Sequence, residues 1–136
     1  MSRHVYSCRV RFSDVDVYGH VNNVKYFEYY QEARLALMSS LGREEGDGRF
    51  SIVLARIDVD YRRPILFRTQ PYAVESWISR VGRSSFDMSA EIKDGDTVLS
   101  RADAVLVSFD LATQAARRLT DVERDLLTGA LETGAG

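Results

Sequence analysis

The sequence predicts an α+β fold in which one long central helix is wrapped by a five-stranded antiparallel sheet. A run from Val24 onward has the apolar spacing of a helix, and five other segments read as strands. Four of these strands follow one another with short links, which favours antiparallel pairing. The whole chain, residues 1–136, is expected to form a single domain, because that length is typical of one folding unit.

The first half of the chain is expected to contain a strand over residues 5–12, a loop over residues 13–22 and the long helix. Asn22 or Asn23 is a natural N-cap for that helix, and Gly42 would end it. Its apolar stripe is wide enough for burial on most sides. The stripe consists of Phe27, Tyr30, Ala33, Leu37 and Leu41, widened by Tyr26, Tyr29, Ala36 and Met38.

The second half is expected to supply the other four strands, over residues 52–61, 72–81, 85–93 and 97–109. The alternation in the first of them predicts that one face carries Val53, Ala55, Ile57, Val59 and Tyr61. Asp94-Gly95-Asp96 predicts a tight hairpin, and Gly82-Arg83-Ser84 a turn. A short helix over 121–128, capped by Thr120 or Asp121, would follow, with a disordered tail from about residue 129.

A single sheet has one face for the helix, so its other face and its edges need cover. This predicts a homodimer or a homotetramer. Net charge is -2, which gives no basic field for nucleic acid. No apolar run reaches transmembrane length, and the first twelve residues lack the apolar core of a signal peptide, so we expect no membrane partner and a cytoplasmic location.

Metal and disulfide chemistry has few candidate residues. Cys8 is the only cysteine, so an internal disulfide framework is ruled out. His4, His20 and Cys8 are the only possible nitrogen or sulfur ligands, and we therefore expect no structural zinc site.

Residues 13–23 combine two aspartates, a histidine, a glycine and two asparagines directly before the aromatic helix. Taken singly, each residue has a structural explanation, because Asp and Asn favour turns and caps and Gly permits unusual backbone angles. His20 alone would be assigned a structural role. The combination at the mouth of a buried helix indicates an active site instead.

Residues 11–26, R-F-S-D-V-D-V-Y-G-H-V-N-N-V-K-Y, resemble the signature of hotdog-fold acyl-CoA thioesterases of the 4-hydroxybenzoyl-CoA thioesterase type. The G-H-V-N-N form is most similar to the bacterial long-chain acyl-CoA branch. The resemblance extends to about residue 127 and implies the hotdog fold, in which the long helix is the sausage and the sheet the bun. It also implies dimers or dimers of dimers with active sites at the subunit interface.

The resemblance assigns roles to several residues of the motif. Asp16 would be the catalytic carboxylate, and the amide of Tyr26, or one close to it, would polarise the thioester carbonyl. His20 and Asn23 match polar positions that line the same site. The implied reaction converts an acyl-CoA to the free acid and CoA without metal or organic cofactor.

The same resemblance implies basic residues for the CoA phosphates near the turn after the third strand. Arg83 matches one of them, followed by Ser84 and Ser85. An ordinary solvated arginine in a turn explains Arg83 equally well. Arg62 and Arg63 form a second candidate patch.

Elementary chemistry agrees with a carboxylate-catalysed thioester hydrolysis. The leaving thiolate has a pKa of about 8.5 and needs little acid assistance. One carboxylate can therefore suffice, as a base on water or as a nucleophile that forms a transient anhydride. We expect partial burial of this carboxylate against the aromatic helix, because burial makes it a stronger base. The free N–H groups of a helix start can stabilise the oxyanion.

Two other functions remain open from sequence. A hotdog enoyl hydratase or dehydratase also places an Asp and a His near a helix start, but it resembles D-x-N-x-x-H rather than D-x-D-x-x-G-H. A non-enzymatic acyl-CoA-binding dimer would keep the pocket and would not need Asp16.

Overall fold

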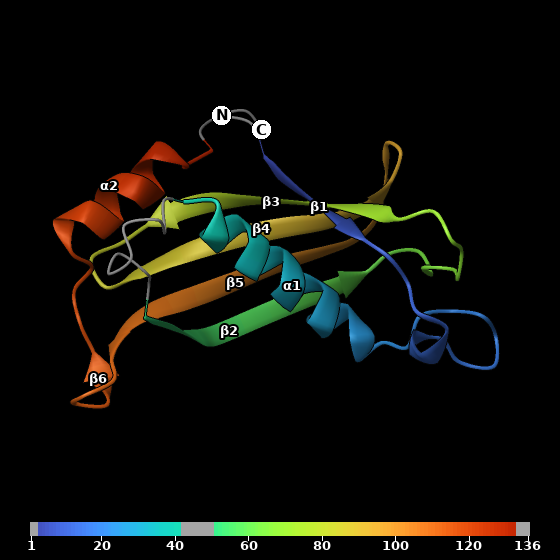
Figure 1. The fold of residues 1–136 in the computed structure, drawn as a ribbon, viewed down its shortest axis with the longest axis horizontal. Helices are drawn as coiled ribbons and strands as arrows, with labels where there is room; N and C mark the ends of the chain where they lie inside the picture. Colours follow the sequence, from blue (N-terminus) through green and yellow to red (C-terminus); the bar gives the residue numbers. More distant parts are fainter. Residues whose placement is uncertain (1–2, 42–50, 133–136) are drawn as a thin grey trace.

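The computed structural model describes residues 3–41 and 51–132, in which a long helix lies across one face of an antiparallel sheet (Figure 1). The sheet order is β1-β3-β4-β5-β2, and β6 pairs with β5. The elements are β1 (His4–Cys8), the 3-10 turn η1 (Phe12–Asp14), α1 (Lys25–Ser39), β2 (Ile52–Tyr61), β3 (Tyr72–Val81), β4 (Ser85–Asp94), β5 (Thr97–Asp110), β6 (Ala115–Ala116) and α2 (Asp121–Gly129).

The antiparallel α+β architecture is confirmed, with two differences in detail. The sheet has six strands rather than five, because Ala115–Ala116 pairs with the end of β5. A second helix, α2, accompanies the long one and packs near the end of β3 (Figure 1). It is the short C-terminal helix expected from sequence, and Thr120 caps it by accepting a hydrogen bond from the Glu123 amide.

The first strand is shorter than predicted. We expected it over residues 5–12, but β1 ends at Cys8 and η1 begins at Phe12. Strand β1 is an edge strand whose only neighbour is β3, and Cys8 pairs with Tyr72, the first residue of β3. Beyond that point no strand remains to pair with, so the chain leaves the sheet.

Helix α1 begins one or two residues later than predicted. Its first helical residue is Lys25, with Val24 rather than an asparagine at the N-cap position. Asn22 Oδ1 accepts from the Val24 amide at 3.0 Å, so the side chain makes a local turn before the helix instead of capping it. The expected end at Gly42 lies outside the described residues.

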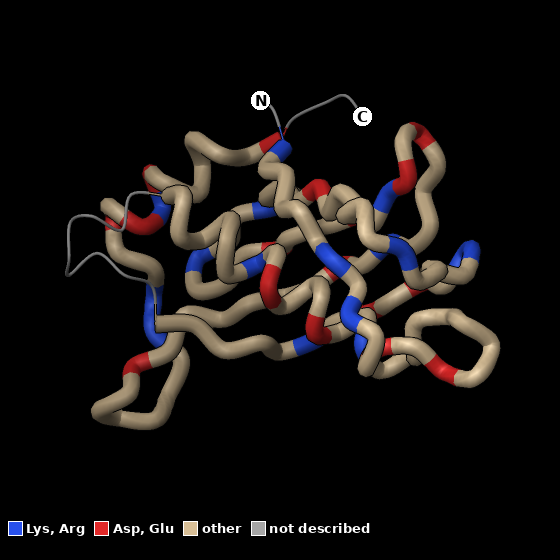
Figure 2. The backbone as a smooth tube through the Cα atoms, turned by 45° about the vertical axis from the view of Figure 1, so that its right-hand side comes forward, with Lys and Arg blue, Asp and Glu red and all other residues tan. Residues whose placement is uncertain are grey.

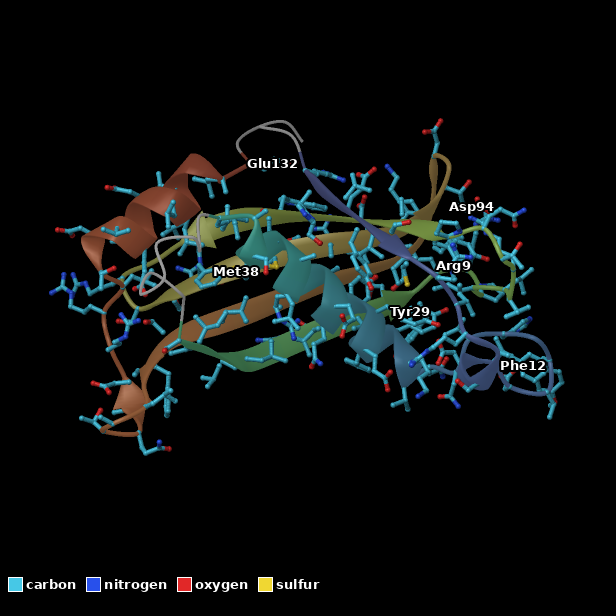
Figure 3. The ribbon with its side chains drawn as sticks, viewed as in Figure 1. Arg9, Phe12, Tyr29, Met38, Asp94 and Glu132 are labelled. Carbon is cyan, nitrogen blue, oxygen red and sulfur yellow. The ribbon has the colours of Figure 1, made fainter. Side chains whose placement is uncertain are left out.

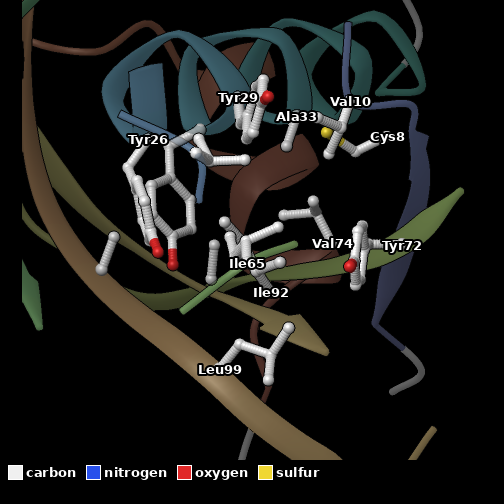
Figure 4. Close-up of a cluster of buried hydrophobic side chains, with 14 residues drawn as sticks. Cys8, Val10, Tyr26, Tyr29, Ala33, Ile65, Tyr72, Val74, Ile92 and Leu99 are labelled. Carbon is white, nitrogen blue, oxygen red and sulfur yellow. The ribbon is translucent and has the colours of Figure 1, made fainter. Parts of the chain in front are cut away.

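Most of the predicted apolar stripe of α1 enters the core. Its buried residues are Tyr26, Tyr29, Tyr30, Ala33, Leu37 and Met38. Tyr26, Tyr29 and Ala33 face the side chains of the sheet and of the segment around Ile65 (Figure 4). Phe27, which we placed on the stripe, is exposed instead.

The prediction that the alternating apolar residues of β2 share one face is confirmed for only half of the strand. Ile57 and Val59 pack against the core as expected, whereas Val53, Ala55 and Tyr61 are exposed. A register shift in the pairing with β5 between Leu54 and Arg56 marks a bulge, and an extra residue there interrupts the alternation. Strand β2 is also an edge of the sheet, opposite the edge strand β1.

The sheet face opposite α1 is charged rather than apolar. Arg3 forms ion pairs with Glu75, Glu91 and Glu132, and its guanidinium lies 3.6 Å from the centre of the Trp77 ring. Figure 2 shows acidic and basic residues interspersed along the strands. Within one chain these charged contacts cover part of this face. The homodimer or homotetramer stays a prediction. The sheet edges at β1 and β2 are a further reason to expect a second subunit.

The turns between β3, β4 and β5 form where the sequence predicts them. Gly95, at a φ of +61°, and Asp96 link β4 to β5 as predicted, and Gly82 donates to Ser85 at 2.7 Å in the turn between β3 and β4. The tail was expected to be disordered from about residue 129. Residues 129–132 are described, and the Glu132 amide donates to the Ile78 carbonyl at 2.9 Å, whereas residues 133–136 lie outside the described ranges. In the described ranges, no helix is long and apolar enough to span a membrane.

Candidate active site

The loop between η1 and α1 is closed by its own backbone. Asn22 donates to the Asp14 carbonyl at 2.8 Å, and Val15 bridges to Val21. Nearer the tip, the Asp16 amide donates to His20 at 2.9 Å. Gly19 has a φ of +77°, a left-handed conformation that glycine adopts readily. These links hold Asp16 and His20 in one small loop.

The two aspartates of the motif have opposite environments. Asp14 is fully buried and accepts a hydrogen bond of 2.7 Å from the Tyr29 hydroxyl. Arg11 contacts the same carboxylate through its amide and its guanidinium. Burial opposes ionisation of Asp14, but these hydrogen bonds outweigh it and lower its pKa. These contacts engage Asp14 in holding the loop.

Asp16 is exposed and only half engaged. Its Oδ1 accepts from the amides of Tyr18 at 2.9 Å and His20 at 3.2 Å. No residue in the described ranges donates to Oδ2. The carboxylate is thus oriented by the backbone with one oxygen left for chemistry. We expected it to be partly buried against the helix; in a single chain it is not.

The start of α1 offers one weakly engaged amide. The Lys25 amide donates to Asn22 at 2.9 Å, and that of Phe27 to Val24 at 3.2 Å. The Tyr26 amide reaches the Asn23 carbonyl only at 3.4 Å, at the long limit for such a bond. Among these three amides it is the one that another acceptor could most readily engage.

One cleft of about 230 Å³ brings much of the predicted site together. Asp16, His20, Asn23 and Tyr26 line it, so the four residues assigned to catalysis share one space. Arg62 and Arg63 line it too, although Arg62 also lies 3.7 Å from Asp60.

Arg83, Ser84 and Ser85 lie elsewhere in the chain. They follow the Val81 end of β3, whereas the loop with Asp16 adjoins the Tyr72 end. Ten residues of strand separate the two ends by roughly 30 Å. The Ser85 hydroxyl is engaged by Arg80 at 3.0 Å. Within one chain, these residues and the cleft at Asp16 do not meet.

Three residues of interest were not proposed from sequence. The Tyr61 hydroxyl donates to the Asn23 carbonyl at 3.1 Å, and its ring meets that of Tyr26 edge-on at 4.7 Å. Arg118 and Arg124 join Arg83 around a second cleft of about 850 Å³ at the start of α2. Tyr61 could have been suspected from its place at the end of an apolar strand, but the arginine cluster carries no local signal, because its members come from separate elements.

Residues 3–41 and 51–132 contain no group of three His, Cys, Asp or Glu side chains placed to hold a metal ion. Cys8 is free and buried, and burial raises its pKa to about 12. A thiol of that kind is a poor nucleophile.

Comparison with known proteins defines the class. The model of the thioesterase-like superfamily matches residues 10–128. The chain is 31% identical over 131 residues to the long-chain acyl-CoA thioesterase FadM of Escherichia coli, covering 88% of this chain and 92% of that protein. The chain belongs to the thioesterase-like superfamily and is a thioesterase, as the resemblance implied.

Solved structures share the fold. A predicted thioesterase from Bacillus stearothermophilus superposes with a TM-score of 0.87 at 22% identity, over 98% of this chain and 100% of the other. A thioesterase from Thermus thermophilus, solved in complex with coenzyme A and Zn, gives a TM-score of 0.80 at 28% identity, over 93% and 92%. The hotdog fold expected from sequence is thereby confirmed.

Proposed function

We propose that this protein hydrolyses acyl-CoA thioesters, with Asp16 as the catalytic carboxylate. The observation that carries the proposal is the cleft in which Asp16, with Oδ2 unengaged, lies beside the start of α1. The similarity to FadM, and the coenzyme A bound in the Thermus thioesterase, support an acyl-CoA as substrate.

The mechanism follows from this arrangement. Asp16 Oδ2 either removes a proton from an attacking water or attacks the carbonyl carbon itself to form an anhydride. The carbonyl oxygen gains negative charge and turns toward the Tyr26 amide, where the helix dipole also favours it. His20 and Asn23 contact the same space and orient the substrate or the water. CoA then leaves as a thiolate, and water completes hydrolysis of any acyl intermediate.

The motif and the comparisons favour this reaction over the two alternatives. A hydratase or dehydratase must move protons at adjacent carbons, which requires a second proton-transfer group close to the carboxylate. His20 lines the same cleft, so the D-x-D-x-x-G-H motif and the similarity to FadM, rather than the geometry, favour a thioesterase. A pure binding protein would not need Asp16, so the intact D-x-D-x-x-G-H motif counts against that function.

We further propose that the working unit is at least a homodimer joined along β2. This strand is a free edge and exposes Val53 and Leu54. Unpaired strand edges are satisfied by pairing with another strand. If β2 pairs with the β2 of a second copy about a two-fold axis, the two strands run antiparallel. The start of the partner's β2 then lies beside the end of β2 that carries Tyr61 and the cleft.

A dimer of this kind would unite the two separated parts of the predicted site. The cleft with Arg83, Arg118 and Arg124 in one subunit would lie about four strand spacings from Asp16 of the other, or roughly 20 Å. That distance suits an extended pantetheine arm between thioester and phosphates. Three guanidinium groups favour phosphate. Arg124 also contacts the Gly82 carbonyl, which fixes its orientation.

The decisive measurement is thiol release over a panel of acyl-CoAs, and absence of hydrolysis with every one would refute the proposal. Mixing Asp16→Asn and Arg83→Ala subunits then tests the shared site. If sites are shared, a statistical mixture has about a quarter of its sites fully intact. The kinetics of the mixture must therefore show an active component with the wild-type KM. If each subunit works alone, no such component appears.

A further inference from the structure

Asp16 borders a second cleft, which is apolar and which the proposed mechanism does not use. This cleft, of about 580 Å³, is lined by Phe12, Val15, Asp16, Val17, Gly19 and Phe67. Phe12 and Val17 are 80% and 93% exposed, and Phe67 is exposed as well. Large apolar side chains grouped at such exposure are uncommon unless they serve binding.

The walls of this cleft are attached to the loop that carries Asp16. Phe67 donates its amide to the Gly19 carbonyl at 3.2 Å, and Leu66 bridges to His20. Phe12 lies in η1, at the base of the loop (Figure 3). Its ring meets that of Phe67 edge-on, with centres 5.9 Å apart. These links therefore hold the apolar surface at a fixed position relative to the Asp16 carboxylate.

Asp16 thus stands between two clefts of opposite character. On one side are His20, Asn23, Arg62 and Arg63; on the other are the rings of Phe12 and Phe67. A thioester also has two arms of opposite character, the polar pantetheine arm and the acyl arm. The residues after β2, which adjoin its free edge, line the polar cleft. The polar arm would therefore leave toward the partner subunit.

We infer that the apolar cleft binds the acyl chain and that Phe12 and Phe67 make the enzyme select hydrophobic, extended acyl groups. This inference rests on the proposed thioesterase function and adds the substrate class. Burial of each methylene contributes about 0.8 kcal/mol, or roughly a fourfold gain in kcat/KM. Selectivity should therefore rise with each carbon that the cleft can cover and then level off.

The test compares decanoyl-CoA with butyryl-CoA. For the wild-type protein we expect kcat/KM to be much higher with decanoyl-CoA. The double variant Phe12→Ala with Phe67→Ala should lower the decanoyl-to-butyryl ratio of kcat/KM by at least about tenfold, since it removes the two rings that contact the chain. Val17→Ser should lower the ratio more modestly. Leu111→Ala removes an exposed leucine between β5 and β6, far from the loop, and should keep the wild-type ratio.

The outcomes separate this inference from the proposed function. If the wild-type protein hydrolyses acyl-CoAs but the double variant and Val17→Ser keep its ratio, the acyl chain binds elsewhere and the inference is overturned. A change of mass in light scattering on Phe12→Ala would show that the patch is a subunit contact, which also overturns it. Hydrolysis of no acyl-CoA by the wild-type protein would refute the proposed function itself.

Discussion

The Tyr29 hydroxyl donates a 2.7 Å hydrogen bond to Asp14, and this bond joins the loop that carries Asp16 to the second turn of α1. The Asp14 carbonyl in turn accepts from the Asn22 amide, at the other end of the loop. The buried pair therefore sets where Asp16 lies relative to the helix start. It has no contact with the cleft at Asp16, so its effect on catalysis is one of positioning.

Tyr29→Phe should lower kcat by about tenfold with little change in KM, because the loop loses one attachment to the helix. Loss of the hydroxyl also leaves Asp14 less satisfied, at a cost of about 1–3 kcal/mol in the free energy of unfolding. Tyr30→Phe is a matched control, because the Tyr30 hydroxyl bonds to Ser100 in the core, at 2.7 Å. Both variants should have a lower melting temperature, and only Tyr29→Phe should have a lower kcat. Equal kcat values would assign Tyr29 to stability alone.

Asp16→Asn should lose at least about three orders of magnitude in kcat, equivalent to ~4 kcal/mol of transition-state stabilisation. The amide keeps the shape of the carboxylate but lacks its basic, nucleophilic oxygen. Asp14→Asn should reduce kcat much less than Asp16→Asn does but lower the melting temperature more, since Asp14 is buried and paired. Steady-state kinetics and thermal unfolding of both variants provide the comparison. An inactive Asp14→Asn beside an active Asp16→Asn would reverse the assignment.

His20→Ala should reduce activity by about one to two orders of magnitude, in line with a modest acid–base or orienting contribution. The His20 main chain holds Asp16 through its amide and carbonyl, and both survive the substitution. The loop should therefore stay in place, and the melting temperature should change little. A wild-type rate would give His20 a purely structural role.

Arg83→Ala should raise KM for full-length acyl-CoA and leave kcat nearly unchanged, because a remote phosphate contact contributes uniform binding. Short pantetheine thioesters, which lack the nucleotide, should not respond. Arg80→Ala serves as a control at the same end of the sheet, since the Arg80 guanidinium is occupied by Asp87. An unchanged KM in Arg83→Ala would remove Arg83 from the site.

Acid should destabilise the protein partly through Glu123. Burial opposes ionisation of Glu123, but hydrogen bonds from Arg117 and the Thr120 amide outweigh it and lower its pKa. A lowered pKa stabilises the folded state above the unfolded value of about 4.3, and this contribution is lost as pH falls through the folded value. Glu123→Gln should thus be less stable at pH 7 and lose less stability between about pH 4.5 and 2.

Exposed Asp125, on the same helix, offers the control for that measurement. Asp125→Asn should follow the wild-type dependence of the melting temperature on pH. If Glu123→Gln follows it as well, the ion pair with Arg117 does not contribute to acid sensitivity.

Much of this fold can be predicted from sequence because its signals are local. The period of the apolar residues in α1, the alternation in β3 to β5 and the glycine at Gly95 each act over a few residues. The polar motif around Asp16 is equally local, so four catalytic candidates were found together, and the structure lines one cleft with them.

Tertiary structure decided what depends on pairing between distant segments. The early end of β1 follows from the length of β3, and the exposure of Val53 follows from a bulge against β5. Both are properties of a neighbouring strand, which local periodicity does not record. In the same way, only the folded chain placed Tyr29 on Asp14, set Phe67 beside Asp16 and carried Arg83 to the far end of the sheet. The ten residues of β3 place Arg83 and the loop with Asp16 tens of ångströms apart, and local sequence patterns carry no information about that distance.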